Sequence, residues 1–193
     1  IYTLRNTDRG ISLQYGQLKS NGSQSDGDHF AASVHAVPKF GNWTLALQLT
    51  AYALDVDAAQ PLGTDELVQF GAYDFPTLVA ARAWIPAASI SYRIDVPQLT
   101  WLDYVLPYVE YSAIRKEEGG FSDSELLVVG SAWSSGGWYI YTEWAYSNGN
   151  DFVGNKAGYG APAGLPYFTS NRFGANPTDD WEYRVNINLG YYF

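Results

Sequence analysis

The chain has 193 residues, enough for one domain with a sizeable interior, and carries a net charge of −9 with a pI near 4.5. This acidic balance argues against a nucleic-acid partner, because phosphate binding relies on clusters of Lys and Arg. Cys and Met are both absent, which excludes disulfides, thiolate nucleophiles and Cys-based metal sites. A spanning helix needs about 20 consecutive apolar residues, and the best candidate, residues 75–92, is broken by Pro76, Arg82 and Pro86.

Two-residue alternation of apolar and polar side chains recurs along the chain, bounded by clusters of Gly, Asn, Asp and Pro. No run shows a sustained 3.6-residue period, so an all-β fold is predicted. In chain order, eight strands are expected at residues 10–20, 29–40, 42–55, 78–95, 99–115, 124–133, 138–147 and 180–193. No internal repeat or linker separates them, so residues 1–193 are expected to form a single domain.

The connections between these expected strands alternate in length. Those at residues 39–42, 95–98 and 134–137 are tight, whereas those at 21–28, 55–75, 116–123 and 148–179 are longer and more polar. Outer-membrane barrels have short periplasmic turns and longer extracellular loops. The pattern therefore predicts a transmembrane antiparallel up-and-down β-barrel, with the first strand running outward. The last loop, residues 148–179, is rich in Gly, Asn, Pro and aromatics, and a connection of that length is usually functional or disordered.

The last expected strand, WEYRVNINLGYYF, carries the strongest signal. A strand with hydrocarbon on one side and water on the other alternates in this way. The alternative, a half-buried strand in a soluble core, needs only the alternation, but this apolar series is longer than a mean strand of about 5–6 residues supplies. One parity is apolar throughout and holds Trp181, Tyr183, Val185, Ile187, Leu189, Tyr191 and Phe193, while the other holds Glu182, Arg184, Asn186 and Asn188.

Two expected strands fit the alternation less well. In residues 78–95 the polar parity places Arg82 on the apolar side, unless it lies above the hydrocarbon or a bulge near Pro86 changes the phase. In residues 99–115, Asp103 and Glu110 fall on opposite parities. One of these two carboxylates is therefore expected to lie near a rim.

The ending NINLGYYF resembles the terminal strand of Gram-negative outer-membrane porins, in which a final aromatic residue is part of the assembly signal. Together with LRNTDRGISLQYG, WLDYVLPYVEYSAIRK and GGWYIYTEW, it is most similar to the C-terminal half of phosphate-selective-porin-like proteins. The chain begins without a basic-then-apolar leader, and we expect an internal start.

This resemblance implies a 16-stranded barrel, commonly trimeric, that lets small hydrophilic solutes diffuse across the cell outer membrane. It also implies that Tyr191 and Phe193 belong to the signal read by the barrel-assembly machinery, and that lipid and lipopolysaccharide surround the barrel. An eight-stranded chain can instead close on itself, but the interior of such a small barrel is filled by side chains.

Residues that line the lumen should be polar and lie on the inward parity. Rings of inward charge set ion preference, but these candidates mix signs, so they predict neither anion nor cation preference. An alternative is that Glu143, Glu182 and Arg184 pair across the wall and only satisfy one another. The pore-lining candidates are His35, Gln48, Arg93, Glu110, Glu143, Glu182, Arg184, Asn186 and Asn188.

Little in the sequence suggests catalysis. The chain has two histidines, His29 and His35, and neither a nucleophile elbow, an HExxH motif nor a phosphate loop. We therefore expect neither an enzyme nor a bound cofactor. The acidic pairs Asp55 with Asp57 and Asp179 with Asp180 lack the spacing of an EF-hand, so solvated loop charge is the preferred interpretation and no metal site is predicted.

Three functional hypotheses follow from the sequence. The first is a porin or channel for small hydrophilic solutes or ions. The second is a self-contained eight-stranded outer-membrane barrel with a structural, adhesive or ligand-binding role through its extracellular loops. The third is a soluble, aromatic-rich sandwich such as a carbohydrate-binding module, which the alternating loop lengths and the terminal Phe193 argue against.

Overall fold

The computed structural model describes residues 7–20, 25–59, 63–70, 77–118, 121, 123–148 and 181–193. Within these ranges the regular structure consists of β-strands. None of the described residues belongs to a helix with the length and apolar character to cross a membrane. The all-β prediction is therefore confirmed.

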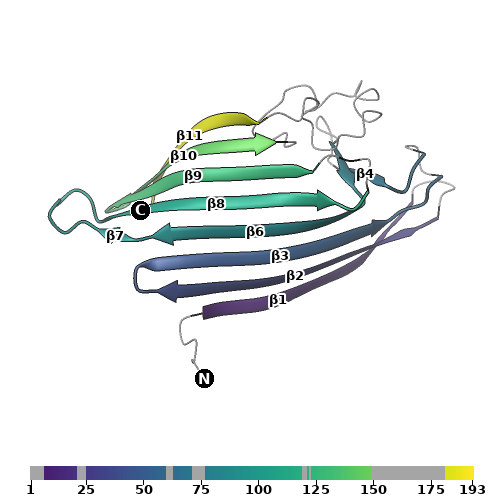
Figure 1. The fold of residues 1–193 in the computed structure, drawn as a ribbon, viewed down its shortest axis with the longest axis horizontal. Helices are drawn as coiled ribbons and strands as arrows, with labels where there is room; N and C mark the ends of the chain where they lie inside the picture. Colours follow the sequence, from purple (N-terminus) through teal and green to yellow (C-terminus); the bar gives the residue numbers. More distant parts are fainter. Residues whose placement is uncertain are drawn as a thin grey trace.

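One antiparallel sheet contains most of the strands, and its order follows the chain, so the up-and-down prediction is also confirmed. In Figure 1 the sheet runs from β1 at the bottom to β11 at the top. Neighbours in the sheet pair in the order β1 (Thr7–Leu18), β2 (Gly27–Phe40), β3 (Trp43–Asp55), β6 (Arg82–Tyr92), β8 (Tyr104–Lys116), β9 (Ser124–Ser135), β10 (Trp138–Asn148) and β11 (Glu182–Tyr191). The short β7 (Ile94–Asp95) also pairs with β8.

Short turns lie at one end of this sheet and the longer connections at the other (Figure 1). Two residues join β2 to β3 and two join β9 to β10. Gly41 and Gly136 begin these turns with φ of 59° and 56°, in the left-handed region that glycine adopts without steric cost. The predicted alternation of connection lengths is confirmed at these positions.

Two predicted boundaries were wrong. The strand expected at 78–95 is divided among β5 (Thr77–Ala80), β6 and β7, and β5 pairs with β4 (Leu67–Phe70) in a separate two-stranded sheet. The strand expected at 99–115 begins only at Tyr104, because residues 96–103 form a turn in which the Val96 N–H donates to the Asp103 carbonyl (3.0 Å). The connection predicted at 95–98 is therefore longer than expected.

The pairing register is staggered across the sheet. One row of paired residues starts beside the β2–β3 turn but reaches β10 well inside that strand. Strands that pair with such a drift are tilted relative to the axis around which their sheet curls. The row contains Lys39, Thr44, Ser91, Tyr108, Gly130, Glu143 and Asn186.

The described strands do not close into a barrel. Within the described residues, β1 pairs only with β2 and β11 only with β10, so the sheet is open at both edges. Barrel closure therefore stays a prediction. The buried apolar residues are few and mostly alanines, including Ala83, Ala132 and Ala145. A conventional two-layer core, in which one sheet covers another, is not present in this part of the chain.

Candidate functional site

Strand pairing places the predicted lining residues other than Arg93 on one face of the sheet, called here the polar face. Side chains directly opposite in an antiparallel pair share a face. Starting from His35, one row of paired residues crosses every main strand: Gly10, His35, Gln48, Ala87, Ser112, Leu126, Ser147 and Glu182.

Neighbouring rows hold most of the other candidates. Glu110, Val128, Ala145 and Arg184 form one row of paired residues from β8 to β11. In the next row on this face, two residues nearer the short turns, Glu143 pairs with Asn186. Asn188 lies two residues further along β11 and therefore shares their face. The assignment of these positions to a single side of the wall, made from alternation, therefore agrees with the strand register.

The polar face is the concave one along β10. Glu143 is half-buried, and Ala145 and Ser147 are buried, whereas Trp144 and Tyr146 between them are exposed. Because side chains crowd on the inner side of a curled sheet, this difference indicates that the sheet bends toward the polar face. Charged and amide groups thus line the inside of the curve.

A hydrogen-bonded cluster spans four strands of this face. The ring of Tyr108 on β8 lies across Gly130 of β9, where an added Cβ would approach the ring carbon Cζ to 2.7 Å. From there the Tyr108 hydroxyl donates to Oε1 of Glu143 at 2.5 Å, and Nδ2 of Asn186 on β11 donates to Oε2 of the same carboxylate at 3.1 Å. Both Glu143 oxygens are therefore engaged by neutral groups, and the bare backbone of Gly130 makes that geometry possible.

Arg93 lies apart from the other candidates, at the short-turn end. It follows β6, its Nε donates to Oδ1 of Asp95 at 2.8 Å, and its guanidinium lies 3.8 Å from the ring centroid of Tyr104. Tyr104 in turn contacts Tyr139 edge-on at 6.5 Å between ring centroids. Arg93 is therefore a rim residue held by a carboxylate and an aromatic ring.

The opposite face, called here the apolar face, carries large apolar side chains that the described residues leave uncovered. On β1 and β11 the exposed fractions reach 75% for Ile11, 73% for Leu13, 64% for Ile187 and 67% for Leu189. The aliphatic residues of this face form a band along the middle of the strands: Ile11, Val34, Leu47, Leu49, Ile90, Val109, Val129, Val185, Ile187 and Leu189.

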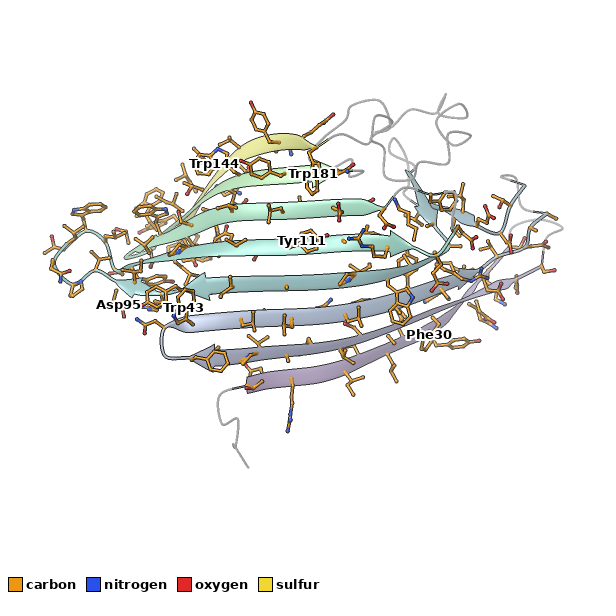
Figure 2. The ribbon with its side chains drawn as sticks, in the orientation of Figure 1. Phe30, Trp43, Asp95, Tyr111, Trp144 and Trp181 are labelled. Carbon is orange, nitrogen blue, oxygen red and sulfur yellow. The ribbon has the colours of Figure 1, made fainter. Side chains whose placement is uncertain are left out.

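Most aromatic residues of this face flank the aliphatic band at its two ends, whereas Trp144 lies within the band between Val129 and Val185. Figure 2 shows Trp43 near the end with the short turns and Phe30 toward the opposite end. Trp43 joins Phe40, Trp133, Trp138 and Tyr191 at the short-turn end. The aromatics at the long-loop end are Tyr15, Phe30, Trp84, Tyr111, Tyr146 and Tyr183.

Most charged groups on the apolar face lie near strand ends and are paired; Arg9, near the start of β1, is exposed, and none of the ion pairs among the described residues involves it. Arg82, which the alternation placed on this side, is the first residue of β6, and its Nη1 lies 3.7 Å from Oε1 of Glu118. Arg115 binds both Asp123 (2.8 Å) and Glu125 (2.7 Å) at the long-loop end. Arg82 therefore needs no change of phase, because it lies beyond the aliphatic band.

Of the two carboxylates Asp103 and Glu110, the one that lies at the rim is Asp103. Its Oδ2 accepts the Gly136 N–H at 2.8 Å and lies 3.4 Å from Oγ of Ser134, so it bridges two short turns. Glu110 lies within β8 on the polar face.

The C-terminal residues are attached to the β9–β10 turn. The Tyr192 N–H donates to the Gly137 carbonyl at 2.8 Å, and Tyr191 pairs with Trp138, with ring centroids 5.0 Å apart. Tyr191 also stacks on Phe193 at 6.4 Å. The two predicted assembly residues therefore project together from the apolar side at the short-turn end.

Acidic residues in the long connections bind backbone groups. Asp57 accepts N–H groups from Ser25 (2.9 Å) and Ala59 (2.9 Å), and these hydrogen bonds hold the pKa of its carboxyl below the ordinary value. Among the described residues no group of three or more metal-ligating side chains forms a cluster. Asp179, Asp180 and the predicted loop after Asn148 lie outside the described residues.

Alternation missed Tyr108 as a member of the polar face. An aromatic residue in such a strand is usually assigned to the lipid side, and the signal that corrects this is its two-residue spacing from Glu110.

Searches among protein-family models, curated proteins and solved structures found no match to this chain.

Proposed function

We propose that this chain is part of a transmembrane β-barrel of a Gram-negative outer membrane, and that the barrel is a porin through which small hydrophilic solutes diffuse. The observation that carries the proposal is the contrast between the two faces of one sheet. The apolar face is continuous and uncovered, and the polar face is concave and charged. Catalysis has no part in this proposal.

The apolar face supports contact with lipid. Exposed apolar patches larger than a few hundred Å² are rare on soluble monomers and mark surfaces that contact a membrane or a partner. An aliphatic band between two rows of aromatic residues is the pattern that lipid-facing barrel walls show. Charged side chains such as Arg115 and Arg82 lie at the long-loop end, where headgroups of lipid or lipopolysaccharide would meet them.

A barrel requires that the two open edges of the sheet, at β1 and β11, be paired. Hydrocarbon does not tolerate unpaired backbone N–H and C=O groups, so a spanning sheet must be closed. The edges at β1 and β11 lie on opposite sides of the sheet (Figure 1), and the stagger of the pairing is that of tilted barrel strands. Closure by further strands would produce the wider lumen of a porin, assembled by the machinery that reads Tyr191 and Phe193.

Conductance in planar lipid bilayers tests the proposal. Purified full-length protein, folded in detergent and showing heat-modifiable migration, should add discrete conductance steps in KCl. The same preparation after boiling provides the control and should add none. A folded, inserted protein without conductance would rule out the porin and would favour the alternative, a closed barrel that acts through its loops.

A further inference from the structure

A hollow in the polar face is the feature that the proposed function leaves unexplained. It has a volume of about 490 Å³, is centred on β3, β6 and β8, and reaches β2 and β9 at its sides. Its floor is made of the small side chains of Ala46, Ala87 and Ser89, and both polar residues and larger apolar residues such as Leu126 and Val128 surround it. Strands lie about 4.8 Å apart, so the small side chains of β6 leave a gap about two strand spacings wide between Gln48 on β3 and Ser112 on β8.

The polar residues around this hollow include one carboxylate, Glu110, together with the neutral or titratable groups of His35, Gln48, Ser89 and Ser112. Gln48 uses its Nε2 to donate to Thr50 Oγ1 at 3.0 Å, and its carbonyl oxygen stays available to a solute. Ser89 and Ser112 add hydroxyl oxygens, and Glu110 adds a carboxylate. The ionised carboxylate only accepts hydrogen bonds and attracts cations, whereas the hydroxyls, the amide and the His35 ring can donate or accept; the charge that discriminates between ions is therefore that of Glu110.

Glu110 has neutral neighbours on its own face. Its direct partners across the strands are Ser89 on β6 and Val128 on β9, and the next residues along β8 on the same side are Tyr108 and Ser112. No ion pair involves Glu110 among the described residues. Its negative charge is therefore not cancelled by the side chains next to it.

The second carboxylate nearby adds to this charge. Glu143 shares its row with Tyr108 and Gly130, next to the row of Glu110. The two groups that hydrogen-bond to Glu143, Tyr108 and Asn186, are neutral, and the cation nearest to Glu143 in the strand register is Arg184 on β11, the strand farther from the hollow. The hollow thus adjoins two negative charges on the inner side of the curve.

We propose that this hollow makes the pore prefer small cations over anions. The inference rests on the proposed porin function and names the class of solute that it favours. A cation crossing the lumen would lose part of its hydration in the hollow and gain the carboxylate of Glu110 and the oxygens of Gln48, Ser89 and Ser112. An anion at the same place would meet repulsion from Glu110 and Glu143.

The reversal potential of the full-length protein in a planar bilayer with a KCl gradient tests the inference. The parent protein should have a K⁺/Cl⁻ permeability ratio above one. Glu110→Gln should lower that ratio about tenfold, because one unit charge acting through water several ångströms away changes the permeability of each ion about threefold and in opposite directions. Glu66→Gln removes the same charge from an exposed position between β3 and β4, outside the hollow, and should leave the ratio unchanged.

Ser89→Lys provides a second, independent variant, because it places a positive charge on the floor of the hollow and should reverse the preference toward Cl⁻. A conducting pore that favours Cl⁻, or whose ratio is the same before and after Glu110→Gln and Ser89→Lys, would overturn the cation inference and leave the porin function intact. A folded parent protein without conductance would overturn the porin function itself.

Discussion

The Tyr108–Glu143 contact illustrates how a single glycine determines part of the polar face. The tyrosine on β8 reaches a carboxylate on β10 only because β9 presents no side chain at Gly130. A hydrogen bond to a charged group is worth more than a neutral one, about 1.5–3 kcal/mol net. The absence of a side chain at Gly130 therefore allows the Tyr108 ring to take its position, and the conformational freedom of the Gly130 backbone is not what the contact requires.

Gly130→Ala should lower the free energy of unfolding by about 1–2 kcal/mol, because the added methyl group displaces the Tyr108 ring and weakens its hydrogen bond to Glu143. Urea titration of the folded protein in detergent, followed by Trp fluorescence, measures the change. Gly190→Ala is the matched control, because its Cβ would meet neighbouring atoms only at 3.6 Å, an ordinary contact. Equal stability of the two variants would show that the ring does not depend on Gly130.

The strand is the scale at which the sequence is most informative. Alternation alone, with no knowledge of the fold, predicted the eight main strands and the shared face of Glu143 and Asn186. It could do so because a period of two is a local property of any strand that lies between two environments. The second half of the 96–103 turn was missed because the apolar residues Leu99 and Trp101 share the parity of Val105 on β8 and so continue the alternation. The hairpin of β4 and β5 was missed because its strands are too short to show a period.

The candidate site was less predictable than the fold. The identity of polar-face residues follows from parity, but their contacts depend on which strands are neighbours and on the register between them. The pairing of β8 with β6 and β9 determines that Glu110 has neutral partners. It also determines that the Tyr108 ring crosses Gly130. Alternation within one strand holds no information about either.

Ile187→Lys on β11 should destabilise the folded protein in lipid vesicles by about 2–4 kcal/mol, the cost of a lysine near the middle of a bilayer on the lipid face. Asn188→Lys, one residue further on the polar face, should change stability by less than about 0.5 kcal/mol, as for an ordinary water-facing substitution. Denaturant titration in vesicles compares the two. Ile187 is 64% exposed in the chain, so equal tolerance of lysine at both positions would mean that water covers the apolar face.

For the whole molecule, the central feature is a single curled layer with two unlike sides. A soluble protein would cover the apolar side with a second layer, and the described strands supply none. In a membrane, lipid replaces that layer and the polar side faces water. The aromatic rows at both strand ends, shown by Trp43 and Phe30 in Figure 2, then coincide with the two membrane interfaces.

Spin-label accessibility along β11 tests this two-sided arrangement most directly. The chain has no Cys, so single cysteines introduced at each residue from 183 to 190 give uniquely labelled proteins. In lipid vesicles, labels at odd positions such as Val185 and Ile187 should collide with oxygen dissolved in the bilayer, and labels at even positions such as Asn186 and Asn188 with a water-soluble nickel complex. Accessibility should therefore alternate with a period of two. Equal access of the nickel complex to both parities would contradict the account.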